Sequence, residues 1–321
     1  MSLPRLGITV LLFATLVATA ATQSSPQKML ATGRVDEAIS ALQQRLSASS
    51  TDAEPNHWLG RAYYSLQDWD RAIQYGEKAV ELSPNQSNYQ MWLARAYGEK
   101  AESASFLSAA GWAKKARVAW ERAVELDPSN VEARTDLAEF YFEAPGIVGG
   151  GKDKARAQAD ALLKVAPSKA HWVYARMAEK NKDSAVAESE YKAAQAASKD
   201  EAEGWMYLAS FYRNAGRLAD MESAIQKAAA APSKDCDPWM DAAHTLFRTG
   251  RNFPLAMELA KRCLAPDKGS EDSPAFKAHT LLGQFYEKQG DKNAAADEYR
   301  TALALAKNFK PAQDGLRRTS R

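Results

Sequence analysis

The sequence is poor in the residues from which metal and nucleophile sites are usually built. Its 321 residues include two cysteines and four histidines. No two histidines are spaced four residues apart, and no HExxH, CxxC or GxSxG motif occurs. These absences exclude the common zinc-hydrolase, dithiol and α/β-hydrolase signatures. We therefore expect no metal, no cofactor and no catalytic residue, and we infer that the chain is not an enzyme.

Glycine and proline are also scarce, with 17 and 13 residues, and the segments between them are rich in Ala, Glu, Lys, Leu and Arg. This composition predicts a protein that is mostly helical. An excess of charge of either sign is absent as well, because 42 basic residues stand against 40 acidic ones. Nothing in that balance indicates nucleic acid or an anionic membrane as a partner.

The N-terminal residues 1–20 differ from the rest of the chain. Arg5 precedes an apolar run over residues 6–17, and Ala18-Thr19-Ala20 follows it. A positive charge, an apolar run of about a dozen residues and an A-x-A site are typical of a secretory signal peptide, which we expect to be cleaved before Ala21. The alternative is an uncleaved membrane anchor, for which the run is short. We expect an exported protein, periplasmic or secreted, with no membrane span once the signal is removed.

Residues 59–84 set the pattern for most of the chain. Leu59-Gly60-Arg61-Ala62-Tyr63 supplies a large apolar residue, small residues and an aromatic one, and a second helical run ends at Pro84. Leu59 and Tyr63 lie on one face of a helix, while small residues allow a second helix to cross closely. The aromatic position recurs at Tyr97, about 34 residues after Tyr63.

This pattern resembles the tetratricopeptide repeat, a helix-turn-helix unit of about 34 residues. The resemblance implies an all-α, right-handed superhelical solenoid of antiparallel helix pairs. We predict about seven repeats in residues 52–308, after a degenerate N-terminal repeat or cap in residues 21–51 and before a basic C-terminal tail in residues 309–321. Tyrosines at the motif's core position are expected to pack the helix pairs: Tyr63, Tyr97, Tyr141, Tyr212 and Tyr286.

Two segments depart from the repeat period. The insert Glu99–Lys115 is Ala-rich and carries large apolar residues at helical spacing, so we expect longer helices there rather than a loop. A Gly-rich segment over residues 144–152 interrupts the third repeat. Together with residues 116–128 and 137–141, this segment resembles a group of exported bacterial tetratricopeptide proteins for which no biochemical role is defined.

The same Gly-rich segment contains part of a phosphate-binding motif. Gly146-Ile147-Val148-Gly149-Gly150-Gly151-Lys152 fits the pattern GxxxxGK. A phosphate-binding loop follows a buried strand and continues with Ser or Thr, whose hydroxyl binds magnesium. Here Asp153 occupies that place and would repel phosphate, and an amphipathic helix precedes the loop. We therefore interpret the segment as a connector between two helices.

Cys236 and Cys263 both lie in the part of the chain that would be exported. On the repeat pattern, Cys236 begins one helix and Cys263 lies near the end of its antiparallel partner. These ends are neighbours, so a disulfide between the two residues is compatible with an oxidising compartment. The alternative is a pair of buried free thiols, and we favour the disulfide.

The first helices of such repeats line a concave surface, where we expect a partner to bind. Arginine offers several donors to carboxylates, and methionine offers adaptable apolar contact. Glu132, Glu139 and Glu143 would make this groove bipolar. The alternative is an ordinary solvated helix face whose arginines pair with glutamates along the helix. The helical period assigns these residues to the groove: His57, Arg61, Met91, Arg95, Trp172, Arg176, Met206, Arg213, Met240, His244 and Arg248.

We therefore predict a non-catalytic scaffold that binds a protein or peptide segment in the concave groove. Four arginines would orient acidic or terminal groups of that segment: Arg61, Arg95, Arg176 and Arg213. The first alternative is a structural subunit of an envelope assembly that binds through its convex or end surfaces. The second is an exported enzyme, although the repeats leave no separate domain to hold a site. The Asn and Lys pattern with which chaperone-binding repeats hold a C-terminal carboxylate is absent from these positions.

Overall fold

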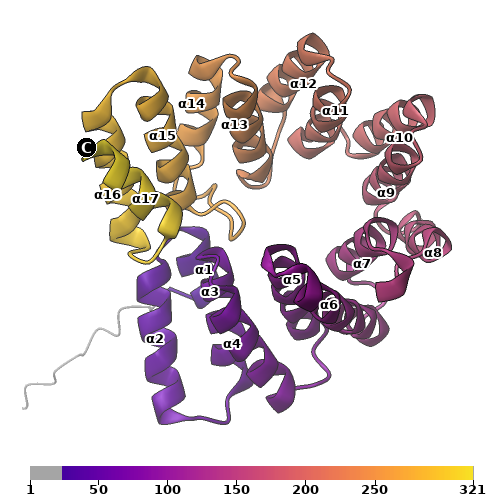
Figure 1. The fold of residues 1–321 in the computed structure, drawn as a ribbon, viewed down its shortest axis with the longest axis horizontal. Coiled ribbons are helices and arrows are strands. Elements are labelled where there is room, and N and C mark those ends of the chain that lie inside the picture. Colours follow the sequence, from indigo (N-terminus) through magenta and orange to yellow (C-terminus); the bar gives the residue numbers. More distant parts are fainter. Residues whose placement is uncertain (1–23, 321) are drawn as a thin grey trace, which may run out of the picture.

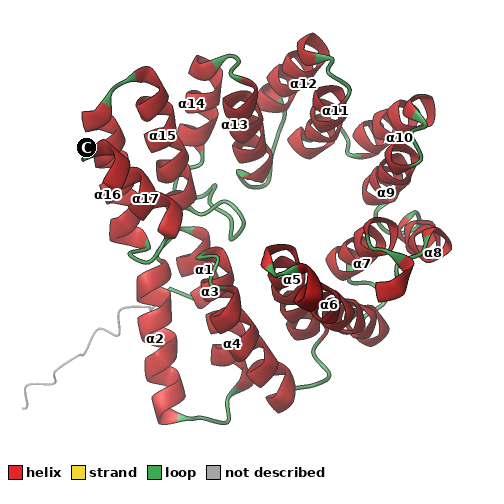
Figure 2. Ribbon diagram, viewed as in Figure 1, coloured by secondary structure: helices red, strands yellow, loops and turns green. Residues whose placement is uncertain are grey.

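The computed structural model describes residues 24–320, apart from the side chains of Phe106 and Leu107. The predicted signal peptide, residues 1–20, lies outside the described residues. Within residues 24–320 the chain forms α-helices and one short 3-10 helix, η1, and no strand, which confirms the predicted all-α fold (Figure 2). The elements are α1 (Pro26–Ala31), α2 (Val35–Ala48), α3 (Ala53–Ser65), α4 (Trp69–Leu82), α5 (Ser87–Ser103), α6 (Phe106–Leu126), α7 (Val131–Glu143), η1 (Gly146–Val148), α8 (Lys152–Leu162), α9 (Pro167–Lys180), α10 (Ser184–Ala197), α11 (Ala202–Asn214), α12 (Leu218–Ala230), α13 (Asp237–Thr249), α14 (Phe253–Arg262), α15 (Ala275–Gln289), α16 (Lys292–Leu305) and α17 (Lys310–Thr319).

The helices form pairs that follow the predicted repeats. Seven pairs, from α3–α4 to α15–α16, succeed one another along the chain. The pair α1–α2 precedes them and is incomplete, because α1 contains only 6 residues. The single helix α17 follows the last pair. α5 and α6 contain 17 and 21 residues, which confirms the expectation of longer helices around the insert.

Several turns inside the pairs share one backbone conformation and one cap. A residue with positive φ follows the first helix and reverses the chain. The next residue, an aspartate, accepts a hydrogen bond from the backbone N–H three residues further on, and so satisfies a free donor at the start of the second helix. Three turns have this arrangement, with φ of 62°, 62° and 82° at their first residue: Gln67-Asp68, Lys182-Asp183 and Gly290-Asp291.

Small residues let the helices approach closely, as the motif predicts. A Cβ on Gly60 of α3 would lie 3.3 Å from the backbone nitrogen of Gly76 on α4. Near the C-terminus, the fully buried ring of Tyr299 fills the space over Gly283 on α15 and Gly315 on α17, so the predicted tail contains a helix that packs on the last repeat. The five tyrosines expected in the core are buried or partly buried against it: Tyr63, Tyr97, Tyr141, Tyr212 and Tyr286.

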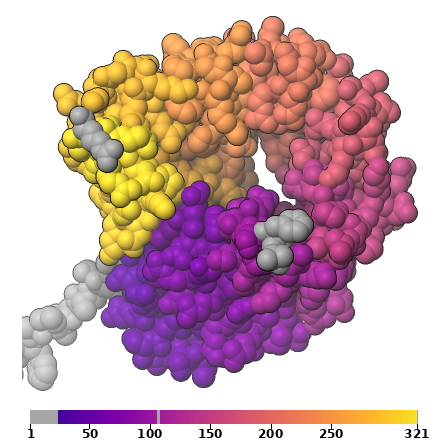
Figure 3. Space-filling view, viewed as in Figure 1, coloured from indigo at the N-terminus to yellow at the C-terminus, as the bar shows by residue number. Residues whose placement is uncertain are grey.

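The solenoid closes into a ring, which the repeat pattern does not predict. In Figure 1 the first helices, α1 to α3, lie beside the last ones, α15 to α17, and the other pairs follow around a centre. The space-filling view shows an opening near this centre (Figure 3). The odd-numbered helices from α3 to α13 face the centre, and the even-numbered helices form the outer layer (Figure 1).

Close backbone contacts hold the two ends of the solenoid together. The Lys307 backbone N–H donates a hydrogen bond to Asp36 Oδ2 at 2.9 Å. Gly33, at φ 79°, lies so near α15 that a Cβ there would be 3.0 Å from the Ala275 nitrogen. Gly269, in the loop between α14 and α15, likewise has no room for a side chain against the end of α1.

A shared apolar core joins the same two ends. Phe276 of α15 is fully buried and contacts Phe309, with ring centroids 4.8 Å apart. Both rings belong to the cluster of buried residues that contains Met29 and Leu30 of α1. Each end of the solenoid therefore covers apolar surface of the other end. In an open solenoid, capping repeats with a polar outer face cover that surface instead.

The two cysteines are neighbours, as expected, but the expected disulfide is not formed. Cys236 precedes α13 and Cys263 follows α14, and both are buried free thiols. The Cys236 thiol donates to the Ser273 carbonyl at 3.4 Å, and the Cys263 thiol donates to the Cys236 carbonyl at 3.5 Å. A hydrogen bond with the Cys236 side chain and burial raise the pKa of Cys263, which disfavours the thiolate needed for disulfide chemistry.

Candidate functional site

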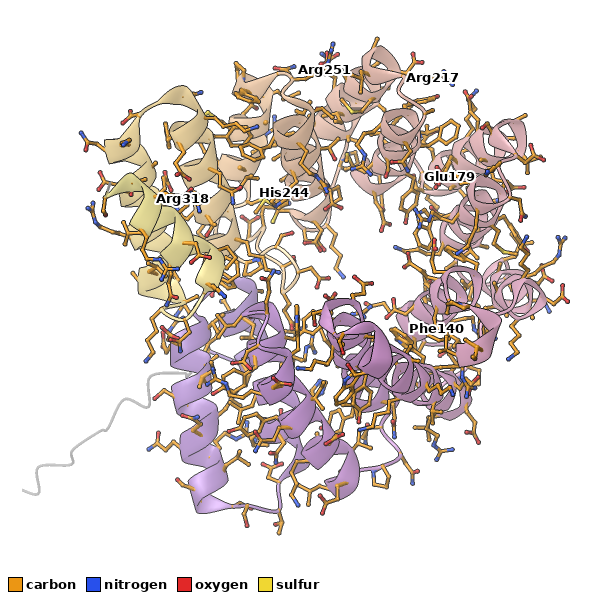
Figure 4. The ribbon with its side chains drawn as sticks, in the orientation of Figure 1. Phe140, Glu179, Arg217, His244, Arg251 and Arg318 are labelled. Atoms are coloured by element: carbon orange, nitrogen blue, oxygen red, sulfur yellow. The ribbon has the colours of Figure 1, made fainter. Side chains whose placement is uncertain are left out.

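Every residue predicted for the groove lies on a helix of the inner layer of the ring (Figure 1). They lie on α3, α5, α9, α11 and α13, and Figure 4 shows side chains of these helices directed toward the centre. The structure nevertheless divides them into three groups. Some belong to the core, some pair with carboxylates of other segments, and most of the rest line a cavity.

Four of the predicted groove residues are buried, and one of them, Met206 at 7% exposed, also lines the cavity described below. Met91 and Met240 are 2% and 3% exposed. His57 is 6% exposed and stacks on Tyr89, with ring centroids 4.3 Å apart. Burial and the charge of Arg61 lower the pKa of His57 to about 3, so the ring stays neutral. The helical period misassigned Met91, Met240 and His57 because an inner helix exposes only a narrow strip between its two neighbours.

Arg61 is held between the first repeat and the last loop. Its guanidinium carbon lies 4.4 and 4.1 Å from the ring centroids of Trp58 and Trp92. Its Nη2 is 2.5 Å from Oε2 of Glu271, in the loop between α14 and α15, and both side chains are less than 15% exposed. Burial lowers the pKa of Arg61 and raises the pKa of Glu271 to about 7. Burying the two charges therefore costs more than their attraction returns.

Arg95 and Arg176 join successive repeats. Arg95 Nε is 2.6 Å from Asp136 Oδ2, and Arg176 Nη2 is 3.0 Å from Glu143 Oε1, with both carboxylates on α7. Together with Arg61, these residues form internal ion pairs, so their guanidinium groups already have carboxylate partners within the chain. The closest of these pairs run between helices, whereas the alternative had pairs along one helix; of the three arginines, Arg176 also has a pair of that kind, 4.0 Å from Glu179.

Four of the five remaining predicted residues, counting Met206, line a cavity of about 560 Å³ between α9, α11 and α13, here called the α9–α13 cavity; His244 is not among its lining residues. Trp172 and Met206 contribute apolar wall, and Arg213 and Arg248 line it as well. His244 faces the centre of the ring from α13 (Figure 4). Burial and the charge of Arg248 lower the pKa of His244 to about 4.

Charges of opposite sign lie at opposite ends of the helices that form the α9–α13 cavity. Arg213 and Arg248 lie in the last turns of α11 and α13, and neither forms an ion pair within the described part of the chain. Arg213 instead contacts Asn214 and Ser210 on its own helix. The N-terminal ends of the helices and the loops before them carry five carboxylates and two lysines, Lys169 and Lys234, so one end of the cavity has an acidic excess and the other is basic. Lys169 Nζ is 2.6 Å from Glu203 Oε1. The acidic lining residues are Glu201, Glu203, Asp235, Asp237 and Asp241.

Sequence reasoning missed the acidic end of this cavity. The spacing of one helix face joins Asp237 and Asp241 to His244 and Arg248. The helical period that assigned His244 and Arg248 to the groove therefore also indicated the two aspartates. The prediction placed the acidic part of the groove on the third repeat instead. There the glutamates are largely occupied by arginines, as Glu143 shows.

Among residues 24–320, no cluster of His, Cys, Asp and Glu is arranged to hold a metal ion. In the Gly-rich connector, the N–H groups of residues 149–151 donate to carbonyls of Gly146, Pro145 and Tyr141. They are therefore not directed at an anion. None of the described helices has the length and apolarity to cross a membrane.

Comparison with known proteins identifies the repeat. Residues 29–97, 149–202 and 276–309 each match a tetratricopeptide-repeat family model. No curated protein sequence matches the chain. Among solved structures, yeast Tom70 is similar over 94% of this chain and 65% of its own, at 14% identity and a TM-score of 0.53. A thermophilic TPR protein of Thermus thermophilus is similar over 58% of this chain and 98% of its own, at 20% identity and a TM-score of 0.47.

Proposed function

Because the chain belongs to the tetratricopeptide-repeat family, we propose that it is a non-catalytic scaffold that binds a segment of a partner protein on its inner surface. Solenoids of this kind generally present extended concave surfaces to other proteins. The site we propose is the α9–α13 cavity. The alternative sites on the inner surface, around Arg61 and Arg95, are filled by internal ion pairs.

One observation carries this assignment. Arg213 and Arg248 face the cavity without a carboxylate partner in the described part of the chain, whereas Arg61, Arg95 and Arg176 all have one. A guanidinium group gains most from a bidentate carboxylate. We therefore infer that the partner segment brings an acidic side chain or a C-terminal carboxylate to this end of the cavity.

The rest of the cavity defines the remainder of the segment. Asp237 and Asp241 at the opposite end would bind a lysine or arginine. Trp172 and Met206 would contact an apolar side chain between the two charges. The expected segment is thus short, carries both signs of charge and has an apolar residue in the middle.

A displayed library of random peptides, selected on the purified protein, tests this function. We expect enriched peptides with an acidic and a basic residue on either side of an apolar one. Their affinity for the double variant Arg213→Glu/Arg248→Glu should fall at least about tenfold, which corresponds to about 1.4 kcal/mol, because each lost charge-assisted hydrogen bond contributes about that much or more.

The matched control is Lys192→Glu/Arg300→Glu, which reverses two charges on the outer helices α10 and α16. Their side chains are 61% and 62% exposed, and binding should not change. Equal binding to both double variants would move the interface to the outer or end surfaces and favour a structural subunit. An absence of enriched peptides would refute the binding function and make a screen for hydrolase activity the next step.

We also propose that the protein is exported to the periplasm or secreted, on the evidence of residues 1–20 alone. Fractionation of source cells followed by N-terminal sequencing tests this proposal. A mature protein that begins at Ala21 is expected. A full-length protein in the cytosolic fraction would contradict it.

A further inference from the structure

The two segments that depart from the repeat period meet at one cavity. The insert in the second repeat lengthens the end of α5 and the beginning of α6, and the Gly-rich segment after α7 forms the loop that contains η1. Residues from both segments line a cavity of about 820 Å³ together with α7. We call it the α5–α7 cleft. It shares no lining residue with the α9–α13 cavity.

The floor of the α5–α7 cleft is apolar and smooth. Four alanines of α6 line it, and Trp120 and Phe140, with ring centroids 5.8 Å apart, form a wall (Phe140 is labelled in Figure 4). Ile147 of η1 lies at the edge with 83% of its surface exposed. A row of small side chains beside bulky ones allows another helix to approach closely. The alanines are Ala109, Ala110, Ala113 and Ala116.

The rim of the cleft is acidic. Its charged lining residues are one arginine and five carboxylates, and the arginine, Arg95, is already paired with Asp136 at 2.6 Å. Glu139 and Glu143 lie 3.7 and 3.0 Å from Arg176, which is not part of the lining. Glu99 and Glu102 form no ion pair within the described part of the chain. An incoming cation would therefore find two free carboxylates beside an apolar floor.

A buried group and a half-buried group in the cleft lack a full set of partners. The indole N–H of Trp120 has no acceptor among the described residues, although the side chain is only 9% exposed. Glu99 accepts one hydrogen bond, from the Tyr64 hydroxyl at 3.2 Å, and burial raises the pKa of Glu99. A bound basic group beside Glu99 would compensate for that burial.

We propose that the α5–α7 cleft binds a short basic amphipathic helix of a partner protein. Its apolar face would lie on the alanines of α6 between Trp120, Phe140 and Ile147, and its lysines or arginines would reach Glu99 and Glu102. The volume lies within the range of about 300–1,000 Å³ typical of ligand sites, and apolar anchors at i, i+3, i+4 and i+7 suit a groove of this shape. Acidic rims repel fatty acids and anionic lipids, so an acyl chain does not fit the same surface.

A selection experiment with two peptide libraries tests this proposal. Both libraries present amphipathic helices of about 14 residues, roughly four turns, with a randomised apolar face; one has lysine and arginine on its flanks and the other has glutamate. We expect enrichment from the basic library only. The selected peptides should lose affinity at least about tenfold when salt is raised from low to high concentration or when the cleft carboxylates are removed.

The variant Glu99→Gln/Glu102→Gln removes the two free carboxylates and keeps their shape, and Ala113→Trp fills the floor. Each should abolish or strongly weaken binding while the circular dichroism spectrum stays that of the wild type. The matched control is Glu81→Gln/Glu125→Gln, which makes the same chemical change at side chains that are 67% and 69% exposed. The control should bind like the wild type.

Three results would overturn the proposal: no enrichment from the basic library, equal enrichment from the acidic library, or displacement of the selected peptide by a fluorescent fatty acid. Binding that survives Ala113→Trp would also refute it, because the peptide would then lie elsewhere. The double variant Arg213→Glu/Arg248→Glu should keep full affinity for these peptides. The α5–α7 cleft and the α9–α13 cavity can therefore fail or succeed independently.

Discussion

Removing the charge of Glu271 should change how the stability of the protein depends on pH. The carboxyl lies beside Arg61 at the closure of the ring, and its pKa rises from 4.5 to about 7 because burial outweighs the attraction of Arg61. The folded protein then holds this proton more tightly than the unfolded chain. The free energy of unfolding therefore falls as the pH rises from about 4.5 to about 7, and it keeps the lower value at higher pH.

The size of the effect follows from the two pKa values. A difference from 4.5 to about 7 corresponds to about 3 kcal/mol, and this is an upper value because opening of the loop alone would rehydrate the carboxylate. Glu271→Gln keeps the shape of the side chain and cannot ionise. The free energy of unfolding of the variant, relative to the wild type, should therefore increase by up to about 3 kcal/mol between pH 4.5 and pH 8.

Urea denaturation at a series of pH values measures this difference directly. The difference between variant and wild type isolates Glu271 from other groups that titrate in the same range. Glu81→Gln, at a side chain that is 67% exposed, controls for the loss of one carboxylate. Parallel profiles for wild type and Glu271→Gln would refute the reasoning, and a difference of opposite sign would mean that the attraction of Arg61 dominates.

Two further predictions concern packing and the thiols. Gly283→Ala should destabilise the fold, because the new Cβ would lie 2.6 Å from the ring of Tyr299. Gly111→Ala on α6 meets no atom within 4 Å and should stabilise the helix by up to about 1 kcal/mol. Thermal denaturation of the two variants and the wild type tests both predictions. Cys236 and Cys263 should react with a thiol reagent only after denaturation, since both are buried. A protein that releases no thiol when denatured without reductant would show that the bond forms after all.

The sequence predicts the local features of this fold well, because they depend on neighbours within one or two repeats. The long helices α5 and α6 follow from an Ala-rich insert with helical spacing, and the helix pairs follow from the spacing of small and aromatic residues. The closed ring is different in kind. It results from the small rotation between successive repeats, added over the whole chain, and no single stretch of residues encodes that sum.

The internal ion pairs in the first half of the predicted groove escaped sequence analysis for a related reason. Helical periodicity correctly put Arg61 and Arg95 on inner helices, but it cannot reveal which carboxylates face them. Asp136 is 41 residues from Arg95 in the sequence, and Glu271 lies in the loop between α14 and α15, far from Arg61 in the sequence. In the α9–α13 cavity no such partners intervene, so Trp172 and Arg213 line the surface that the periodicity predicted.

Closure of the ring changes how the chain comes apart. In an open array of repeats each unit touches only its neighbours, so the terminal units fray first and their amide hydrogens exchange fastest. Here the first and last units are neighbours, through residues as far apart in sequence as Asp36 and Lys307. Contacts of such long sequence separation slow folding, because the entropy of closing the whole chain is lost before they form. While they hold, hydrogen exchange in α1 and α2 should be as slow as in the middle of the array, and the repeats should unfold as one cooperative unit.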